Sequence, residues 1–144
     1  MDTIKTLKST ALFTLAFALT ACADDGASVP FQISAPPPGK ALLYAMNTGT
    51  PTLLGTVRTL YDGDLKIAGI QDGRFVVLPL FPGHYVFTCG DLPRAPKLTI
   101  DARAGYVYFL QAAMNGSVDD QTCATMTYES ASVALKDMTL QSQN

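Results

Sequence analysis

Few side chains in this sequence could carry out catalysis. His84 is the only histidine, and it follows Pro82-Gly83 at the expected start of a strand, where a surface or half-buried turn position is the usual case for a histidine. No serine lies in a G-x-S-x-G turn, and neither Cys89 nor Cys123 has a second His–Asn partner set. We therefore expect no catalytic residues and predict that the protein is not an enzyme.

Acidic side chains are the other candidates, because Asp62, Asp64 and Asp72 lie in or beside expected turns and carboxylates are ligands for Ca²⁺. Their spacing lacks the D-x-[DN]-x-[DN]-G loop, and Asp before Gly is the ordinary chemistry of a hairpin turn. Asp119 and Asp120 are likewise expected at a solvated loop tip. We expect no metal and no cofactor.

The N-terminal segment has the pattern of a secretory signal. Lys5 and Lys8 form a basic region, and residues 11–21 (ALFTLAFALTA) form an apolar run of about 11 residues. A helix needs roughly 20 apolar residues to cross a bilayer, so this run is too short to remain as a membrane span.

Residues 19–22 (LTAC), at the end of this run, resemble the lipobox of bacterial lipoproteins. The resemblance implies that residues 1–21 are removed as a signal peptide, that Cys22 is acylated, with palmitate among its lipids, and that the chain is held at the membrane through this N-terminal lipid. Ala23 directly after the cysteine then favours the outer membrane, with the protein facing the periplasm. The alternative is an ordinary signal peptide cut near Ala21 or Ala23, with Cys22 there by chance.

Two cysteines remain once Cys22 is assigned to the lipid. In an oxidising compartment, an isolated pair at long spacing such as Cys89 and Cys123 predicts a disulfide rather than a metal site or a redox motif, which would use C-x-x-C. A cross-link closing a loop of this size is worth about 4 kcal/mol in the chain-entropy model. The alternative is two buried free thiols.

Removal of the leader leaves 123 residues, enough for one domain. Eight basic and eleven acidic residues remain, for a formal net charge of −3. No basic run is present, which argues against nucleic acid as a partner and gives little electrostatic attraction to anionic lipid.

The expected organisation is a signal peptide over residues 1–21, an acylated cysteine and proline-rich tether over 22–39, and one folded domain over 40–144. The tether ends in Pro36, Pro37 and Pro38, which favour extended polyproline II and a reach of up to roughly 50 Å. The alternative for residues 29–33, which are mostly apolar, is that they dock on the domain as an edge strand.

From Lys40 on, short apolar stretches alternate with turn residues roughly every 8–12 positions, which is typical of an all-β sandwich or barrel. Asp72-Gly73 predicts a type I′ hairpin turn, and Pro82-Gly83 predicts a turn with the glycine at positive φ. Ser130 is expected to cap a short helix over residues 131–138, with Val133, Ala134 and Met138 on its packed side. The predicted fold is a single β-sandwich of about seven to eight strands with a short C-terminal helix. The expected strands are residues 40–46, 53–61, 65–70, 74–80, 84–89, 97–102, 106–113 and 122–129.

Residues 73–87 (GRFVVLPLFPGHYVF) give a strand, a Pro-Gly turn and a second strand that opens with an aromatic residue. This pattern resembles the core of small prealbumin-like sandwich modules such as the PEGA domain and the carboxypeptidase-regulatory-like domain, and residues 98–100 (LTI) and 104–108 (AGYVY) resemble the part that follows. With the lipobox, the whole is similar to a bacterial lipoprotein family of unknown function. The resemblance covers about residues 40–114, leaves Cys123 and the terminal helix unmatched, and implies a non-catalytic envelope module with no catalytic residues.

Tyr106 and Tyr108 are the candidates for surface recognition. They lie on one face of an expected strand, opposite Val107 and Phe109. If the latter two face the core, the tyrosines face outward, where exposed aromatic rings suit recognition of a protein or a glycan. The alternative is that the tyrosines pack under the C-terminal helix.

These features predict a non-catalytic, lipid-anchored envelope protein that acts as a binding or scaffolding module for an envelope protein or for the cell wall. The alternatives are a periplasmic enzyme or enzyme inhibitor that works through His84 or the loops, and a surface-exposed adhesin-like module.

Overall fold

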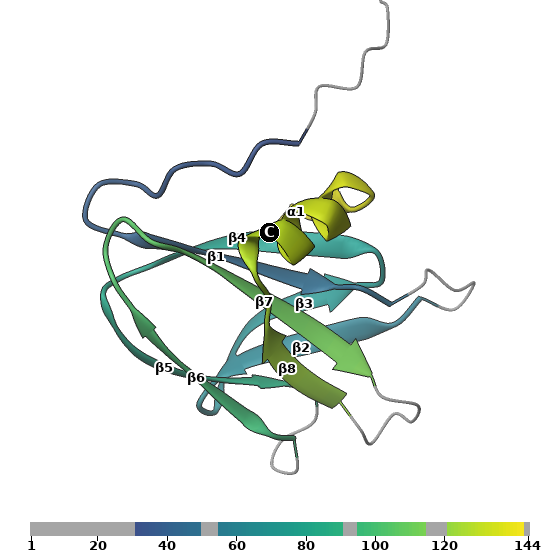
Figure 1. Cartoon of the computed structure of the whole chain (residues 1–144). Helices are drawn as coiled ribbons and strands as arrows, with labels where there is room; N and C mark the ends of the chain where they lie inside the picture. Colours follow the sequence, from purple (N-terminus) through teal and green to yellow (C-terminus); the bar gives the residue numbers. More distant parts are fainter. Residues whose placement is uncertain (1–30, 50–54, 91–94, 115–120, 143–144) are drawn as a thin grey trace, which may run out of the picture.

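The computed structural model describes residues 31–49, 55–90, 95–114 and 121–142. These residues form two β-sheets packed face to face, and a short helix, α1 (Tyr128–Lys136), lies over the outer face of the larger sheet (Figure 1). The predicted all-β sandwich with a short C-terminal helix is confirmed. The larger sheet has the order β8 (Gln121–Thr125), β7 (Val107–Met114), β1 (Ala41–Asn47), β4 (Arg74–Leu80), β9 (Thr139–Leu140). The smaller sheet has the order β3 (Leu65–Gln71), β2 (Val57–Asp62), β5 (Gly83–Cys89), β6 (Lys97–Ala102).

β1 lies at the centre of the larger sheet, and all seven of its residues are buried. It pairs antiparallel with β4 on one side and parallel with β7 on the other. A strand that is covered on both faces has a continuous apolar sequence rather than an alternating one, which explains the run ALLYAM. Its side chains enter two different cores: Ala41, Leu43 and Ala45 the core between the sheets, and Leu42, Tyr44 and Met46 the core under α1.

The Asp72-Gly73 turn does not form the predicted hairpin. β3 pairs with β2 in the smaller sheet and β4 pairs with β1 in the larger one, so this turn carries the chain from one sheet to the other. Of its two central residues only Gly73 has a positive φ, 68°, whereas a type I′ turn needs both in that region. The Asp72 carboxylate instead accepts hydrogen bonds from Thr56 and Asn47, which holds the turn at the corner of the sandwich.

The predicted positive φ at Gly83 is wrong, because Gly83 begins β5 and pairs with Ala102 as a strand residue. Pro38-Gly39 has the type II arrangement instead. The Lys40 N–H donates to the Pro37 carbonyl at 3.0 Å, and Gly39 has φ 73°. The proline tract therefore does not end in an extended rod but turns the chain into β1.

Residues 31–36 form a strap over the outer face of the larger sheet, on the same side as α1 (Figure 1). The Phe31 ring meets the rings of Tyr44 and Phe75 edge-on, with centroid distances of 6.1 and 5.3 Å. Ile33 packs in the same cluster, and the Ser34 N–H donates to the Tyr44 hydroxyl at 2.9 Å. The strap is not an edge strand. The folded part of the chain thus includes Phe31, and the segment left to act as a tether is shorter than the predicted 22–39.

The helix begins earlier than predicted. Thr127 is its N-cap, and the Thr127 hydroxyl accepts a hydrogen bond from the Ser130 N–H at 3.2 Å, so Ser130 lies in the first turn rather than at the cap. The buried positions are Ala131 and Leu135, whereas Val133 is 64% exposed, contrary to prediction. Thr and Ser are both common N-cap residues, so the sequence did not decide between Thr127 and Ser130. The buried pair Ala131 and Leu135, at i and i+4, shows which side of the helix faces the sheet.

The C-terminal segment adds a short ninth strand that the sequence does not signal. β9 pairs in parallel with the start of β4. The next residue, Gln141, donates its N–H to the Phe75 carbonyl at 2.8 Å, while its side-chain amide bonds the Gly69 carbonyl at 2.6 Å and the Gln71 N–H at 3.0 Å. Gln141 thereby bridges the edge of β4 in one sheet to the edge of β3 in the other.

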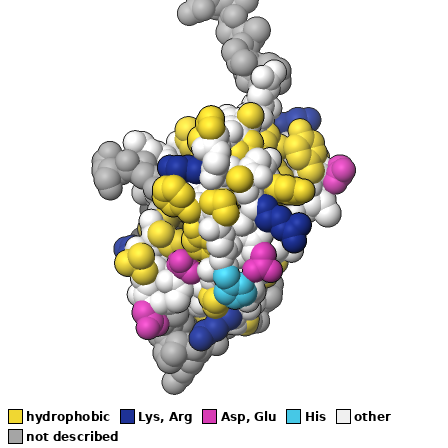
Figure 2. Space-filling view, turned by 90° about the vertical axis from the view of Figure 1, so that its left-hand side faces the viewer, with side chains coloured by type: hydrophobic (Ala, Val, Ile, Leu, Met, Phe, Trp, Pro, Cys, Tyr) yellow, Lys and Arg dark blue, Asp and Glu magenta, His cyan; other side chains and the backbone are white. Residues whose placement is uncertain are grey.

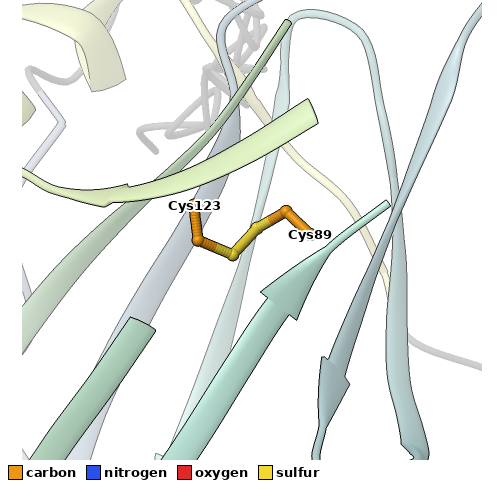
Figure 3. Close-up of a disulfide and its surroundings, with 2 residues drawn as sticks. All are labelled: Cys89 and Cys123. Carbon is orange, nitrogen blue, oxygen red and sulfur yellow. A yellow bond between two sulfur atoms is a disulfide. The ribbon is translucent and has the colours of Figure 1, made fainter. Parts of the chain in front are cut away.

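A disulfide between Cys89 and Cys123 links the two sheets at β8, the edge of the larger sheet opposite β9 (Figure 3). Cys89 is the last residue of β5 in the smaller sheet, and Cys123 lies in β8 of the larger sheet. The predicted pairing is confirmed, and it joins the two sheets covalently.

Candidate functional site

Three turns meet at one end of the sandwich, at the left of Figure 1. We call the surface formed by residues 37–40, 81–83 and 103–106 the loop end. Lys40 connects all three turns, since its carbonyl accepts the Gly105 N–H at 2.9 Å and its ammonium lies 4.5 Å from the centre of the Phe81 ring. The Tyr106 carbonyl accepts the Leu42 N–H at 3.0 Å. The turns are therefore fixed relative to one another by backbone hydrogen bonds at the start of β1 and by the cation–π contact.

Two aromatic rings project from the loop end into solvent. Phe81 is 66% exposed and Tyr106 is 56% exposed. The Tyr106 ring lies beside that of Tyr108, with centroids 6.5 Å apart. The Tyr108 hydroxyl in turn donates to the Asp101 carbonyl at 2.9 Å and accepts the Arg103 N–H at 3.1 Å. Tyr106 is thus an exposed ring supported by a ring that is held in place.

The two tyrosines that the sequence predicted as a pair lie side by side but differ in exposure. Val107 and Phe109 pack in the core under α1, as strand alternation predicts. Tyr108, on the opposite face, is only half-exposed and packs at the border of the core between the sheets. Its ring therefore supports the Tyr106 ring and is not itself an exposed recognition residue. Phe81 was not predicted; its signal in the sequence is a phenylalanine placed next to a Pro-Gly turn, where no core can cover it.

The loop end is apolar and cationic. Its eleven residues are proline, glycine, alanine, Phe81, Tyr106, Lys40 and Arg103, and they include no acid, no amide and no serine or threonine. Figure 2 faces this end, and it shows hydrophobic side chains gathered with Lys and Arg side chains beside them, and Asp or Glu side chains and the histidine on the same face of the molecule.

His84 lies just outside the loop end, on β5, directly opposite Asp101 on β6. Its Nδ1 is 2.7 Å from the Asp101 carboxylate, and the two side chains are 63% and 75% exposed. An ion pair this exposed is screened by solvent and contributes little to stability. The pair has the composition of a base and its orienting carboxylate, but it lies on an open strand surface rather than in a cleft.

The opposite end of the sandwich is closed by a buried polar network around Asp72. Its carboxylate accepts the Asn47 amide at 3.0 Å, the Thr56 N–H at 2.8 Å and the Thr56 hydroxyl. Burial raises the pKa of Asp72, but these hydrogen bonds and the nearby Arg58 charge outweigh burial, so the pKa lies below its ordinary value. Gly49 is required here, because a Cβ at this position would lie 2.6 Å from Asp72 Oδ1. This site is internally satisfied and structural.

The α1 side of the molecule carries three shallow depressions of about 320, 410 and 390 Å³. They flank Tyr128 of α1 and Phe31 of the strap, and two of the apolar side chains that line them, Tyr128 and Leu140, are each more than half exposed. Each depression has room for one or two large side chains of a partner.

Within the described parts of the chain, no three His, Cys, Asp or Glu side chains are grouped so as to hold a metal ion. The helix in those parts is too short to span a bilayer. The predicted signal peptide over residues 1–21, the predicted lipid attachment at Cys22 and the Asp119-Asp120 pair lie outside the described residues.

Comparison of the chain with protein-family models, with curated proteins and with solved structures finds no match. The resemblance to PEGA-like and prealbumin-like modules stays an expectation from the sequence.

Proposed function

We propose that this protein is a non-catalytic, lipid-anchored protein of the bacterial envelope that acts as a binding and scaffolding module for another envelope protein or for the cell wall. In this proposal Cys22 carries the acyl chains, and the domain faces the periplasm from the outer membrane. The relationship to PEGA-like modules belongs to the same proposal, and it rests on residues 73–87 and 98–108.

The observation that carries the proposal is the docked strap. Phe31 follows Cys22 by nine residues, and at about 3.3 Å per residue this segment reaches at most about 30 Å. Because Phe31 packs between Tyr44 and Phe75, a lipid on Cys22 would hold the sandwich near the membrane at a fixed point of attachment. With the sheets joined by the Cys89–Cys123 disulfide, such a domain suits rigid presentation of a surface rather than long-range search.

The surface best suited to a protein partner is the α1 side. Tyr128 of α1 is 60% exposed and lines two depressions of side-chain size. Aromatic and aliphatic anchors in shallow pockets are the usual centres of protein interfaces.

A photo-crosslinking residue placed at Tyr128, in intact cells, tests this proposal. We expect one abundant adduct, captured from the native membrane and lost in the Cys22→Ala variant. Thr99, exposed on β6 in the other sheet, is the matched control position and should give no such adduct. A deletion phenotype rescued by an unrelated lipidated sandwich would contradict the proposal.

The catalytic alternative depends on His84. His84→Ala should leave the deletion phenotype fully complemented, because the His84–Asp101 pair is solvated and its loss disturbs no buried group. Loss of complementation by a stably folded His84→Ala protein would favour an enzyme.

A further inference from the structure

We infer that the loop end is a membrane-contact surface, which places Phe81 and Tyr106 in the interface of an anionic phospholipid bilayer. The inference rests on the proposed lipid anchor for its geometry, but it concerns a different surface from the α1 side. It assigns the domain an orientation: loop end on the bilayer, and the rest of the sandwich presented to the partner.

The first argument is composition. Tyrosine and tryptophan are enriched where a protein meets the headgroup region, because each combines an apolar ring with a polar group, and phenylalanine is among the apolar residues that interfacial segments insert below it. Lysine and arginine beside such rings add attraction to anionic lipid. The chain as a whole has little electrostatic attraction to anionic lipid, but the loop end is locally cationic: the Lys40 ammonium lies against the Phe81 ring, Arg103 is in the same turn as Tyr106, and the loop end contains no acid. Asp101, the acid just outside it, faces His84.

Composition also separates a bilayer from a glycan. Sugar hydroxyls are recognised by side chains that both donate and accept hydrogen bonds, chiefly carboxylates, amides and hydroxyls. The loop end offers one such group, the Tyr106 hydroxyl, among eleven residues. A surface of proline, glycine and aromatic residues with two cations is poorly suited to bind a sugar and well suited to lie at the interface of a bilayer.

The second argument is rigidity. A side chain that enters a membrane interface from a fixed turn loses little conformational entropy in doing so. Phe81 is held under the Lys40 ammonium, and its carbonyl accepts the Tyr85 hydroxyl at 2.9 Å. Tyr106 is supported by the fixed ring of Tyr108. Both rings are exposed without being mobile tips.

The third argument is chain length. The strap takes nine residues to run from Lys40, at the loop end, to Phe31, and nine further residues lead from Phe31 to Cys22. The second segment is as long as the first, so a lipid on Cys22 can enter the same bilayer that the loop end touches. Anchoring then keeps the bilayer at high effective concentration, and two rings with two cations suffice for contact.

The chain contains no tryptophan, so a single introduced tryptophan reports on one position. Phe81→Trp and Tyr106→Trp place it at the loop end. Val57→Trp is the matched control, since Val57 is 54% exposed against 56% for Tyr106 and begins β2 beside the Asp72 network, at the opposite end. Equal urea midpoints for the three variants establish that each is folded.

The full chain, processed in the bacterium, is reconstituted into vesicles of phosphatidylglycerol and phosphatidylcholine with brominated acyl chains. We expect emission from positions 81 and 106 to be quenched about two-fold and blue-shifted, because interfacial side chains are buried about 5–10 Å into the headgroup boundary. Emission from position 57 should be unchanged. Absence of quenching at positions 81 and 106, or equal quenching at position 57, overturns the inference.

Charge supplies the second readout. Lys40→Gln with Arg103→Gln should lower the ratio of domains whose loop end is on the bilayer to domains whose loop end is free. We expect about a five-fold decrease for each cation, at about 1 kcal/mol per basic residue near an anionic surface. Arg74→Gln with Lys97→Gln, two exposed cations away from the loop end, should leave the ratio unchanged. Quenching that is equal in pure phosphatidylcholine also overturns the inference. So does protection of the Phe81→Trp fluorophore by wall fragments instead of vesicles.

Acylation is read separately from the intact mass of the processed chain. A mass without lipid contradicts the anchor, and the same quenching assay with excess anionic vesicles then decides the loop end alone. An acylated chain without quenching leaves the anchor standing and refutes the membrane contact.

Discussion

Phe31→Ala tests whether the strap is part of the fold, which in the proposed lipid anchoring decides how far from the membrane the domain can stand. Complete removal of a buried phenylalanine ring costs about 3–5 kcal/mol. Phe31 is half-buried and makes two edge-on ring contacts, so we expect a loss of about 2 kcal/mol, in line with the aromatic pair values. With a slope of about 2 kcal/mol per molar urea, the unfolding midpoint should fall by about 1 M.

Hydrogen exchange localises the effect. The Ser34 N–H is bonded to the Tyr44 hydroxyl, so its protection should fall in Phe31→Ala if the strap detaches. Tyr44→Phe keeps the ring and removes only the acceptor, and it should cost about 1 kcal/mol. Gln32→Ala, at an exposed position between Phe31 and Ile33, is the matched control and should change neither readout. Equal midpoints for Phe31→Ala and wild type, with Ser34 exchange unchanged, would refute the docked strap.

Reducing the Cys89–Cys123 disulfide should lower the free energy of unfolding by about 4 kcal/mol, the chain-entropy value for a separation of 34 residues; urea midpoints that are the same with and without dithiothreitol would contradict this. Because the pKa of Asp72 is lowered on folding, its stabilisation is present above the unfolded pKa near 4 and is lost as pH falls through the folded pKa. Asp72→Asn should therefore be about 2 kcal/mol less stable than wild type at pH 7, with a gap that narrows below pH 4; a gap independent of pH would rule out the charged network. Gln141→Ala should cost about 1–2 kcal/mol, one weak hydrogen bond to each of Gly69 and Gln71, and should speed exchange of the Gln71 N–H, whereas Ser142→Ala should do neither. Phe81→Ser and Tyr106→Ser should each change the unfolding free energy by less than about 0.5 kcal/mol, since both rings are mostly exposed, so a large loss would mean that these rings serve the fold.

The strand pattern could be predicted from the sequence because it is local. Turn residues mark the ends of the strands, and β4 and β6 have the predicted bounds at residues 74–80 and 97–102. Strand partners are not local. Asp72-Gly73 predicts a sharp turn correctly, but whether the turn joins neighbours or crosses between sheets depends on Asn47 and Thr56, which lie far from it in the sequence.

The sequence left docking of residues 29–33 as an alternative, in the form of an edge strand, and gave no sign of the docked C-terminal segment, for the same reason. In the strap, Phe31 is accompanied by one other large apolar residue, Ile33, and is followed by a tract of prolines. A free tether can have the same composition. Only the outer face of β1, with Leu42, Tyr44 and Met46, creates the apolar surface that needs covering. Nothing in the sequence around Gln141 predicts its role, because its side-chain amide bonds Gly69 and Gln71, about 70 residues earlier in the chain.

The two ends of the sandwich differ in what they do with polar and apolar groups. At the Asp72 end, a carboxylate, an amide and a hydroxyl satisfy one another inside the fold, which stabilises the domain and leaves little for a ligand. At the loop end, the backbone groups of Lys40, Gly105 and Tyr106 are satisfied within the turns, while the Phe81 and Tyr106 rings are mostly exposed to solvent. The fold therefore does not require these side chains, and large rings left in water on a rigid support favour association with whatever surface covers them. If Cys22 carries the proposed lipid, that surface is the membrane, because only nine residues separate Lys40 from Phe31 and nine more separate Phe31 from Cys22.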